Sequence, residues 1–310
     1  MKPSGFVSLA KKNLLALAVG SALANVAMAI PLNYVQHIND DVLQLDNTDN
    51  FVNIKQTAIT TDRKFVYAIS GTQHAIVVFE RDMTTGELTL VDTMPEDTVN
   101  RIGIHMPTAI LISPDDKYVY VLGLEPGHGV AHSDGTRENT TNSAISVFAR
   151  DASTGLLTQI DNNPDEFDLS YEGEGLEQHF YSEAFVMSKN GNQIYVSSMN
   201  SHAVTVLQRA SNGLISQTQK IQPLSKNLTT SNDYPTAIAL SPSQLHLYVA
   251  TGTGSGENDG AIVHFQRNMT TGELTYVDQI DYTSPDLTDF SDPRDIKISP
   301  DGKFLYSVKG

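Results

Sequence analysis

The feature that most constrains the fold is a repeated unit of short apolar runs separated by turns. Its clearest copy, residues 108–161, contains four runs with β-strand character, at residues 109–112, 118–122, 144–150 and 156–161. Ser113-Pro114-Asp115 separates the first two runs, and a segment ending in Thr154-Gly155 separates the last two. Four such runs joined by turn signals are typical of one four-stranded antiparallel sheet. We therefore predict that each copy of the unit forms one sheet.

The spacing of the copies predicts a β-propeller. A tyrosine marks the second run of each copy, at spacings of 53, 75, 53 and 58 residues: Tyr67, Tyr120, Tyr195, Tyr248 and Tyr306. Periods near 50 residues with four strands each are typical of propeller blades. We expect an all-β protein with four full blades and a partial fifth, at residues 57–92, 108–161, 184–219, 236–278 and 295–310.

The repeat stops at Gly310, halfway through a blade. We expect the chain to be part of a longer ring. The alternative is a closed five-bladed ring, in which strands at residues 33–38 and 42–46 complete the last half-blade. Such closure would remove the exposed sheet edge that an open array presents for aggregation.

The first 29 residues have the pattern of a secretory signal. Three lysines precede an apolar stretch at residues 14–23 that is too short to span a bilayer, and Ala27-Met28-Ala29 is a small-x-small cleavage site. We predict a signal at residues 1–29, a propeller at residues 30–310, and a bacterial periplasmic or secreted location without a membrane span after signal removal. The chain contains no cysteine, so the exported protein would form no disulfide.

The charge of the chain predicts the kind of partner that it accepts. The net charge is −16, and it becomes −19 without the three lysines of the leader. Nucleic acid and anionic membranes are therefore not expected as partners. Most of the charge lies in the variable connections between runs, which contain 19 acidic and four basic residues. Propeller geometry places these connections on one face, and we expect that acidic loop face to bind cations or a protein partner.

Two groups of residues in these connections are candidate sites. Ca²⁺ is the only cofactor that we expect, with oxygen ligands from Asp165, Glu166 and Asp168 or from Glu172, Glu174 and Glu177. The residues of a second group each lie just before the first strand of a blade, where side chains approach the mouth of the propeller's central channel. This group could provide the acid/base chemistry of ester or lactone hydrolysis, and it comprises His105, His179 and Glu183.

The motifs resemble those of the β-propeller lactonase family, which includes 6-phosphogluconolactonases and muconate-lactonising cyclases. The likeness rests on Ser-Pro-Asp-Gly/Asp-Lys before the tyrosine strand and on Val-Phe-x-Arg-Asp-x-x-Thr-Gly-x-Leu-Thr, and it covers nearly all of residues 57–310. Family members usually have seven blades, which implies that two or three blades are absent here. The resemblance also implies that Arg294 holds a substrate carboxylate or phosphate.

The chain departs from the family pattern in two short segments, at and after Arg294. Where the family carries Gly-Pro-Arg-His and then Val-Asn-Glu, this chain has Asp292-Pro293-Arg294-Asp295 and Val308-Lys309-Gly310. Two groups capable of acid/base chemistry are thus replaced. We therefore expect an exported, lactonase-like binding or interaction module. The alternative is a hydrolase that opens a sugar lactone, and a third reading is an envelope scaffold that binds protein only.

Overall fold

The computed structural model describes residues 14–17, 34–38, 54–71, 73–95, 104–124, 130–131, 137–138, 143–161, 182–198, 202–222, 224, 234–252, 260–281, 283–284 and 293–309. These residues form strands and turns, without a helix. Accordingly, this part of the chain has no helix that is long and apolar enough to cross a membrane.

Four sheets have four antiparallel strands each, in chain order from the inner to the outer strand. The first contains β3 (Ile54–Ile59), β4 (Phe65–Ser70), β5 (Ala75–Arg81) and β6 (Leu88–Pro95). The second contains β7 (His105–Ile112), β8 (Tyr118–Leu124), β11 (Ser143–Arg150) and β12 (Leu157–Asp161). The third contains β13 (Ser182–Met187), β14 (Gln193–Ser198), β15 (Ala203–Arg209) and β16 (Ile215–Ile221). The fourth contains β17 (Pro235–Leu240), β18 (His246–Thr251), β19 (Ala261–Arg267) and β20 (Leu274–Asp281).

The remaining strands form pairs. A fifth, half-formed blade consists of β21 (Pro293–Ile298) and β22 (Leu305–Lys309), and β1 (Leu14–Leu17) pairs with β2 (Tyr34–Ile38). Within the long insertion of the second blade, β9 (Val130–Ala131) pairs with β10 (Arg137–Glu138). The predicted all-β fold of four-stranded antiparallel blades is confirmed.

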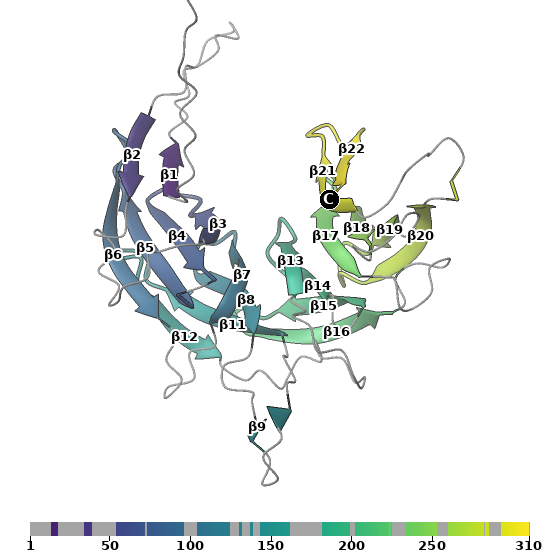
Figure 1. The fold of residues 1–310 in the computed structure, drawn as a ribbon, viewed down its shortest axis with the longest axis horizontal. Coiled ribbons are helices and arrows are strands. Elements are labelled where there is room, and N and C mark those ends of the chain that lie inside the picture. Colours follow the sequence, from purple (N-terminus) through teal and green to yellow (C-terminus); the bar gives the residue numbers. More distant parts are fainter. Residues whose placement is uncertain are drawn as a thin grey trace, which may run out of the picture.

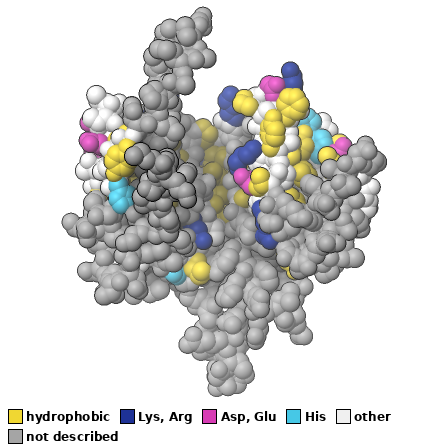
Figure 2. All heavy atoms as spheres, turned by 45° about the horizontal axis from the view of Figure 1, so that its top comes forward, with side chains coloured by type: hydrophobic (Ala, Val, Ile, Leu, Met, Phe, Trp, Pro, Cys, Tyr) yellow, Lys and Arg dark blue, Asp and Glu magenta, His cyan; other side chains and the backbone are white. Residues whose placement is uncertain are grey.

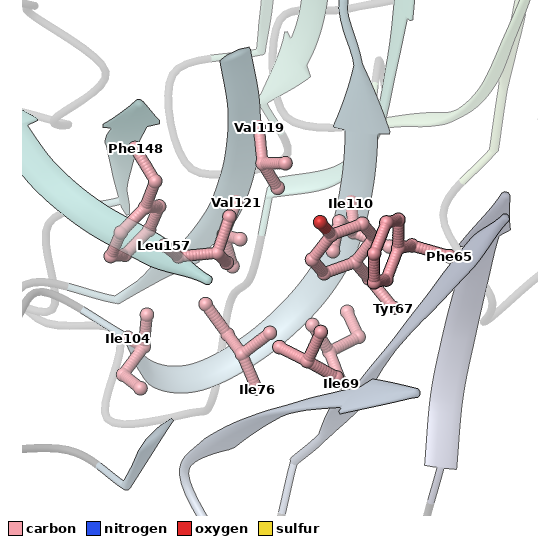
Figure 3. Close-up of a cluster of buried hydrophobic side chains, with 11 residues drawn as sticks. Phe65, Tyr67, Ile69, Ile76, Ile104, Ile110, Val119, Val121, Phe148 and Leu157 are labelled. Atoms are coloured by element: carbon pink, nitrogen blue, oxygen red, sulfur yellow. The ribbon is translucent and has the colours of Figure 1, made fainter. Parts of the chain in front are cut away.

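The blades follow one another along an open arc, with their first strands toward its centre (Figure 1). Adjacent first strands contact each other, from β3 through β7, β13 and β17 to β21. Apolar side chains fill the space between neighbouring blades. Ile69 and Ile76 of the first blade face Ile110 and Val121 of the second (Figure 3), and all four side chains are buried. Burying a side chain of this size is worth about 1.5–3 kcal/mol, so these joints hold the array together.

The hairpin turns have the chemistry that their sequence predicts. In the turn between β11 and β12, the Ser153 hydroxyl and the backbone N–H groups of Ser153 and Thr154 donate hydrogen bonds to the Asp151 carboxylate, which lowers the pKa of Asp151 to about 2. Gly155 completes the turn with a φ of 77°, a conformation that favours glycine.

The strand β2 occupies the place of an outer strand beside the first blade. Its Gln36 side chain exchanges two hydrogen bonds with the backbone of Leu88, of 3.1 and 2.7 Å. Gln219 of the third blade exchanges the same two hydrogen bonds with Leu274 of the fourth. The register of β2 is therefore that of a fourth strand in a blade that precedes the first.

The five-bladed closure considered above is not formed. Among the described strands, β22 pairs only with β21, and β2 pairs with β1 instead of completing the last half-blade. The second strand that this closure needs, at residues 42–46, lies outside the described residues. The backbone of Leu14–Leu17, inside the predicted signal, pairs with β2 in the full chain, since an apolar segment without a bilayer can add to a free sheet edge. Removal of this segment remains a prediction.

Candidate functional site

The first strand of every blade begins with a β-bulge. The pairing register shifts between Ile54 and Gln56 in β3, and one residue is likewise skipped at the start of β13, β17 and β21. In β7 the shift is longer and runs from His105 to Ala109. The hairpin turn to the second strand lies at the other end of each first strand, so the bulges lie on the face that receives the variable connections. A bulge leaves a residue out of the ladder and redirects its side chain, and bulges are common beside active sites.

Equivalent residues occupy the five bulges. In every blade, one first-strand residue pairs with the second-strand tyrosine, and the bulge residue lies three positions before it. In the first blade, Ala58 pairs with Tyr67, and Lys55 is the bulge residue. The resulting bulge row consists of Lys55, Thr108, Glu183, Thr236 and Arg294. Because adjacent first strands contact each other, these residues follow one rim at the centre of the arc.

The two threonines anchor the bulge row. Thr108 Oγ1 donates to the carbonyl of Leu122 at 3.4 Å, and Thr236 Oγ1 reaches the equivalent carbonyl of Ala250 at 3.3 Å. Thr236 also donates to the carbonyl of Pro293 in the next blade. A proline precedes both threonines and Arg294, and its missing N–H suits a bulge, where no ladder hydrogen bond is lost.

The charged members of the bulge row provide two cations and one carboxylic acid. Lys55 and Arg294 are exposed. The Lys55 chain extends across Gly71, where a Cβ atom would lie 2.9 Å from Lys55 Cε, so the glycine leaves room for it. Figure 2 shows the hollow at the centre of this face and the Lys and Arg side chains that border it. Glu183 has its backbone in the bulge of β13, and its side chain is not described.

Two histidines reach the same rim from the neighbouring connections. His74 and His202 each precede a third strand and have φ values of 49° and 48°, which are uncommon for a residue with a side chain. Met106 donates its backbone N–H to His74 Nδ1 at 3.4 Å, and the His202 ring lies 4.4 Å from that of Tyr234. Burial lowers the pKa of His202, so its imidazole is neutral at pH 7.

Only some of the predicted site residues lie in the bulge row. Arg294 and Glu183 are in the bulge row, while His105 begins β7 opposite Leu124, three residues before the bulge position of Thr108. His179 lies outside the described residues, as do all the proposed calcium ligands, which are Asp165, Glu166, Asp168, Glu172, Glu174 and Glu177. In the described part of the chain, no group of three or more His, Asp or Glu side chains could hold a metal ion.

Sequence reasoning missed Lys55, His74 and His202. Lys55 lies in a segment that matches the repeat poorly, but counting three residues back from the partner of each tyrosine would have found it. The residue that replaces the family histidine has a local role. Asp295 accepts hydrogen bonds from the backbone N–H of Ile296 and from Lys297 Nζ, of 2.8 and 2.9 Å.

The fold and the bulge row define a β-propeller with a polar site at the channel mouth. The family model described as a lactonase with a seven-bladed β-propeller matches residues 55–168 and 184–309. The chain therefore belongs to this lactonase family.

Solved structures agree with the fold. A Lactobacillus plantarum protein is 18% identical over 82% of this chain and 62% of its own length, with a TM-score of 0.55. The periplasmic gluconolactonase PpgL of Pseudomonas aeruginosa is 15% identical over 81% of this chain and 60% of its own, with a TM-score of 0.50. At these identities the likeness concerns the fold, and this chain spans less than two thirds of either protein. A search among curated protein sequences finds no match.

Proposed function

We propose that this protein is an exported hydrolase that opens a neutral sugar lactone. The observation that carries the proposal is the bulge row, in which Lys55, Glu183 and Arg294 hold equivalent positions along the inner rim of the first, third and fifth blades. Membership of the lactonase family supports the reaction class. The proposal reverses the preference for a binding module, because a carboxylic acid and two cations at equivalent positions form a set suited to acyl chemistry.

The proposed reaction needs one water molecule and no cofactor. Glu183 accepts a proton from the water as its oxygen attacks the lactone carbonyl, and Lys55 and Arg294 stabilise the oxyanion that forms. When the carbonyl is restored, the ester C–O bond breaks and the ring oxygen takes the proton back from Glu183. The product is a hydroxy acid, whose carboxylate is ionised at neutral pH and can bind Arg294 through two parallel hydrogen bonds.

The charge of the loop face favours a neutral substrate. The variable connections have a net charge of −15, which would repel a phosphorylated sugar. The same field would help an anionic product to leave. Similarity in fold to a periplasmic gluconolactonase and the leader-like residues 1–29 support an extracytoplasmic location.

The proposal is tested by acid release from D-glucono-δ-lactone in a pH-stat. We expect hydrolysis above the spontaneous rate, with Glu183→Gln and Arg294→Met each lowering kcat/KM by about 10²–10³-fold. Lys303→Met is the matched control, because Lys303 is an exposed cation in the hairpin turn on the opposite face. A wild-type rate equal to the spontaneous rate would contradict the proposal.

A second candidate function is binding through the acidic loop face, and the 19 acidic residues of the variable connections favour it. The ligand would be Ca²⁺ or a basic protein surface. Calorimetric titration with Ca²⁺ should then release or absorb heat, and Ca²⁺ should raise the melting temperature of the protein. No heat together with an unchanged melting temperature would exclude the calcium site.

A further inference from the structure

Three polar side chains form a chain of contacts across the outer strands of the fourth blade. His264 of β19 lies between Asp278 of β20 and His246 of β18. His264 Nδ1 is 2.7 Å from Asp278 Oδ1, and His264 Nε2 is 2.9 Å from His246 Nδ1. The His264 ring also stacks on Tyr248, with ring centroids 4.8 Å apart and planes inclined by 13°. Two imidazoles and a carboxylate are thus held in fixed order.

The same position is apolar in the other blades. Counting from the second-strand tyrosine, His264 corresponds to Val78, Val147 and Val206, which are completely buried between blades. His264 therefore replaces a valine of the repeat, and the replacement is accompanied by a hydrogen-bonding partner on each side. A buried or half-buried polar group is costly unless its hydrogen bonds are satisfied, and His264 has a partner for each ring nitrogen. Among the four full blades, this arrangement occurs only in the fourth.

In the other three full blades, the residue equivalent to His246 contacts an arginine side chain. Its equivalents are Phe65, Tyr118 and Gln193. The guanidinium of Arg150 lies 5.0 Å from the Phe65 ring, and that of Arg209 lies 5.0 Å from the Tyr118 ring. Arg267 Nη2 donates to Gln193 Oε1 at the third joint. In these three blades, each of which is followed by another full blade, this position therefore lies beside a positively charged arginine.

The carboxylate of Asp278 determines which nitrogen of His264 is free to bind. An ionised carboxylate only accepts hydrogen bonds, so His264 Nδ1 carries the proton and Nε2 presents its lone pair toward His246. A carboxylate behind a histidine is the usual arrangement for a metal-binding imidazole, since it fixes the tautomer and makes the ligand more basic. Stacking on Tyr248 fixes the plane of the ring as well.

The distance between the two facing nitrogens selects a class of metal. With metal–nitrogen bonds of about 2.0–2.1 Å, nitrogens 2.9 Å apart subtend about 90° at a shared ion. A tetrahedral ion would need them about 3.4 Å apart. An angle of 90° fits two neighbouring corners of a square-planar or tetragonal ion, which copper(II) and nickel(II) prefer, and copper(II) binds nitrogen ligands more tightly than nickel(II) does.

We propose that His246 Nδ1 and His264 Nε2 bind a divalent transition metal, with copper(II) preferred, and that Asp278 positions His264 for this purpose. Water completes the coordination, which is why the site needs only two protein ligands. Binding moves the proton of His246 from Nδ1 to Nε2 and changes no other protonation. The His264 side chain is 19% exposed and that of Asp278 is 71% exposed, so an ion reaches the cluster from solvent.

The test is copper(II) titration of the full chain, followed by calorimetry and by electron paramagnetic resonance. We expect one Cu²⁺ coordinated by two nitrogens in a tetragonal spectrum, and that ion should be lost in His264→Val. This variant restores the valine found in the other three blades and therefore should fold; its far-UV circular dichroism and melting temperature without metal verify this. Because the other histidines and the amino terminus also bind copper, the readout is the difference between the two proteins.

Two further variants separate ligand from positioning roles. His246→Gln should remove the same ion, whereas Asp278→Asn should keep it with a Kd raised by about 10–100-fold. Unchanged copper stoichiometry and affinity in His264→Val would overturn the proposal, and tighter binding of Zn²⁺ than of Cu²⁺ would overturn the assigned geometry. Arg294→Met should leave copper binding unchanged, so the result does not depend on lactone hydrolysis.

Discussion

At the scale of single residues, the joints between blades depend on a buried tyrosine. Tyr67 is completely buried, donates to the carbonyl of Gly155 in the next blade at 2.7 Å and accepts from Arg150 Nε at 2.9 Å. Tyr120 and Tyr195 make the same contact with the glycines of the following blades. Burial raises the pKa of Tyr67 to about 12, so the phenol stays protonated at all physiological pH values.

Removing the Tyr67 hydroxyl should therefore weaken the first joint. In Tyr67→Phe the buried carbonyl of Gly155 and the Nε of Arg150 each lose a partner, and we expect a loss of about 1–3 kcal/mol in the free energy of unfolding. Tyr306→Phe is the matched control, because Tyr306 has the same position in the repeat but is 60% exposed. Equal effects in urea denaturation would show that the hydroxyl contributes no specific contact.

At the scale of elements, the hairpin between the third and fourth strands must carry a glycine for two separate reasons. Gly213 has a φ of 90°, and a Cβ added to it would lie 2.3 Å from Cδ1 of Tyr118 in the preceding blade. Gly155 and Gly272 face Phe65 and Gln193 in the same manner, with Cβ distances of 2.4 Å. The hairpin is thus both a left-handed turn and a contact surface between blades.

Gly213→Ala and Gly302→Ala separate these two effects. Gly302 also has a positive φ, of 71°, but an added Cβ would meet Pro242 only at 3.7 Å, so its variant should lose about 1–2 kcal/mol from backbone strain. Gly213→Ala should lose about 1–3 kcal/mol more, because Tyr118 must move. Urea denaturation measures both, and similar losses in the two variants would assign the whole cost to φ.

At the scale of the whole molecule, the array is held by contacts that each blade makes with the next. Besides the apolar joints, glutamine side chains connect successive outer strands, as Gln219 does with Leu274 and Gln36 with Leu88. Each blade depends on its neighbours, as in other repeat proteins, where stability is approximately a sum of units and interfaces.

Loss of one glutamine connection should reduce the stability of the whole array. Gln219→Ala leaves the N–H and carbonyl of Leu274 without these partners, and we expect a loss of about 1–3 kcal/mol in thermal or urea unfolding. Gln217→Ala on the same strand is the control, because Gln217 is exposed, and it should change stability by no more than about 0.5 kcal/mol. If both variants unfold alike, the connection between outer strands is unimportant.

The candidate site was predictable in part. Glu183 was named because it precedes a recognisable first strand, and Arg294 because of the family resemblance. Lys55 was missed because residues 30–56 match the repeat poorly, and only a count along the strands from each tyrosine leads to it. The bulges themselves leave no clear pattern, since one unpaired residue shifts the register without altering composition. Most acidic residues of the loop face and all the calcium ligands lie outside the described residues, and binding through that face remains a prediction.

The all-β fold, the number of full blades and the chemistry of the turns follow from the sequence alone, because these depend on local periodicity and on residues within one hairpin. Which residues meet across strands and blades depends on how the strands pair in the folded protein. His264 meets Asp278 and His246, and Lys55 and Arg294 occupy equivalent bulges in β3 and β21, through a register that local patterns do not encode. The repeat thus predicts the scaffold, and the pairing of its strands decides where the chemistry can occur.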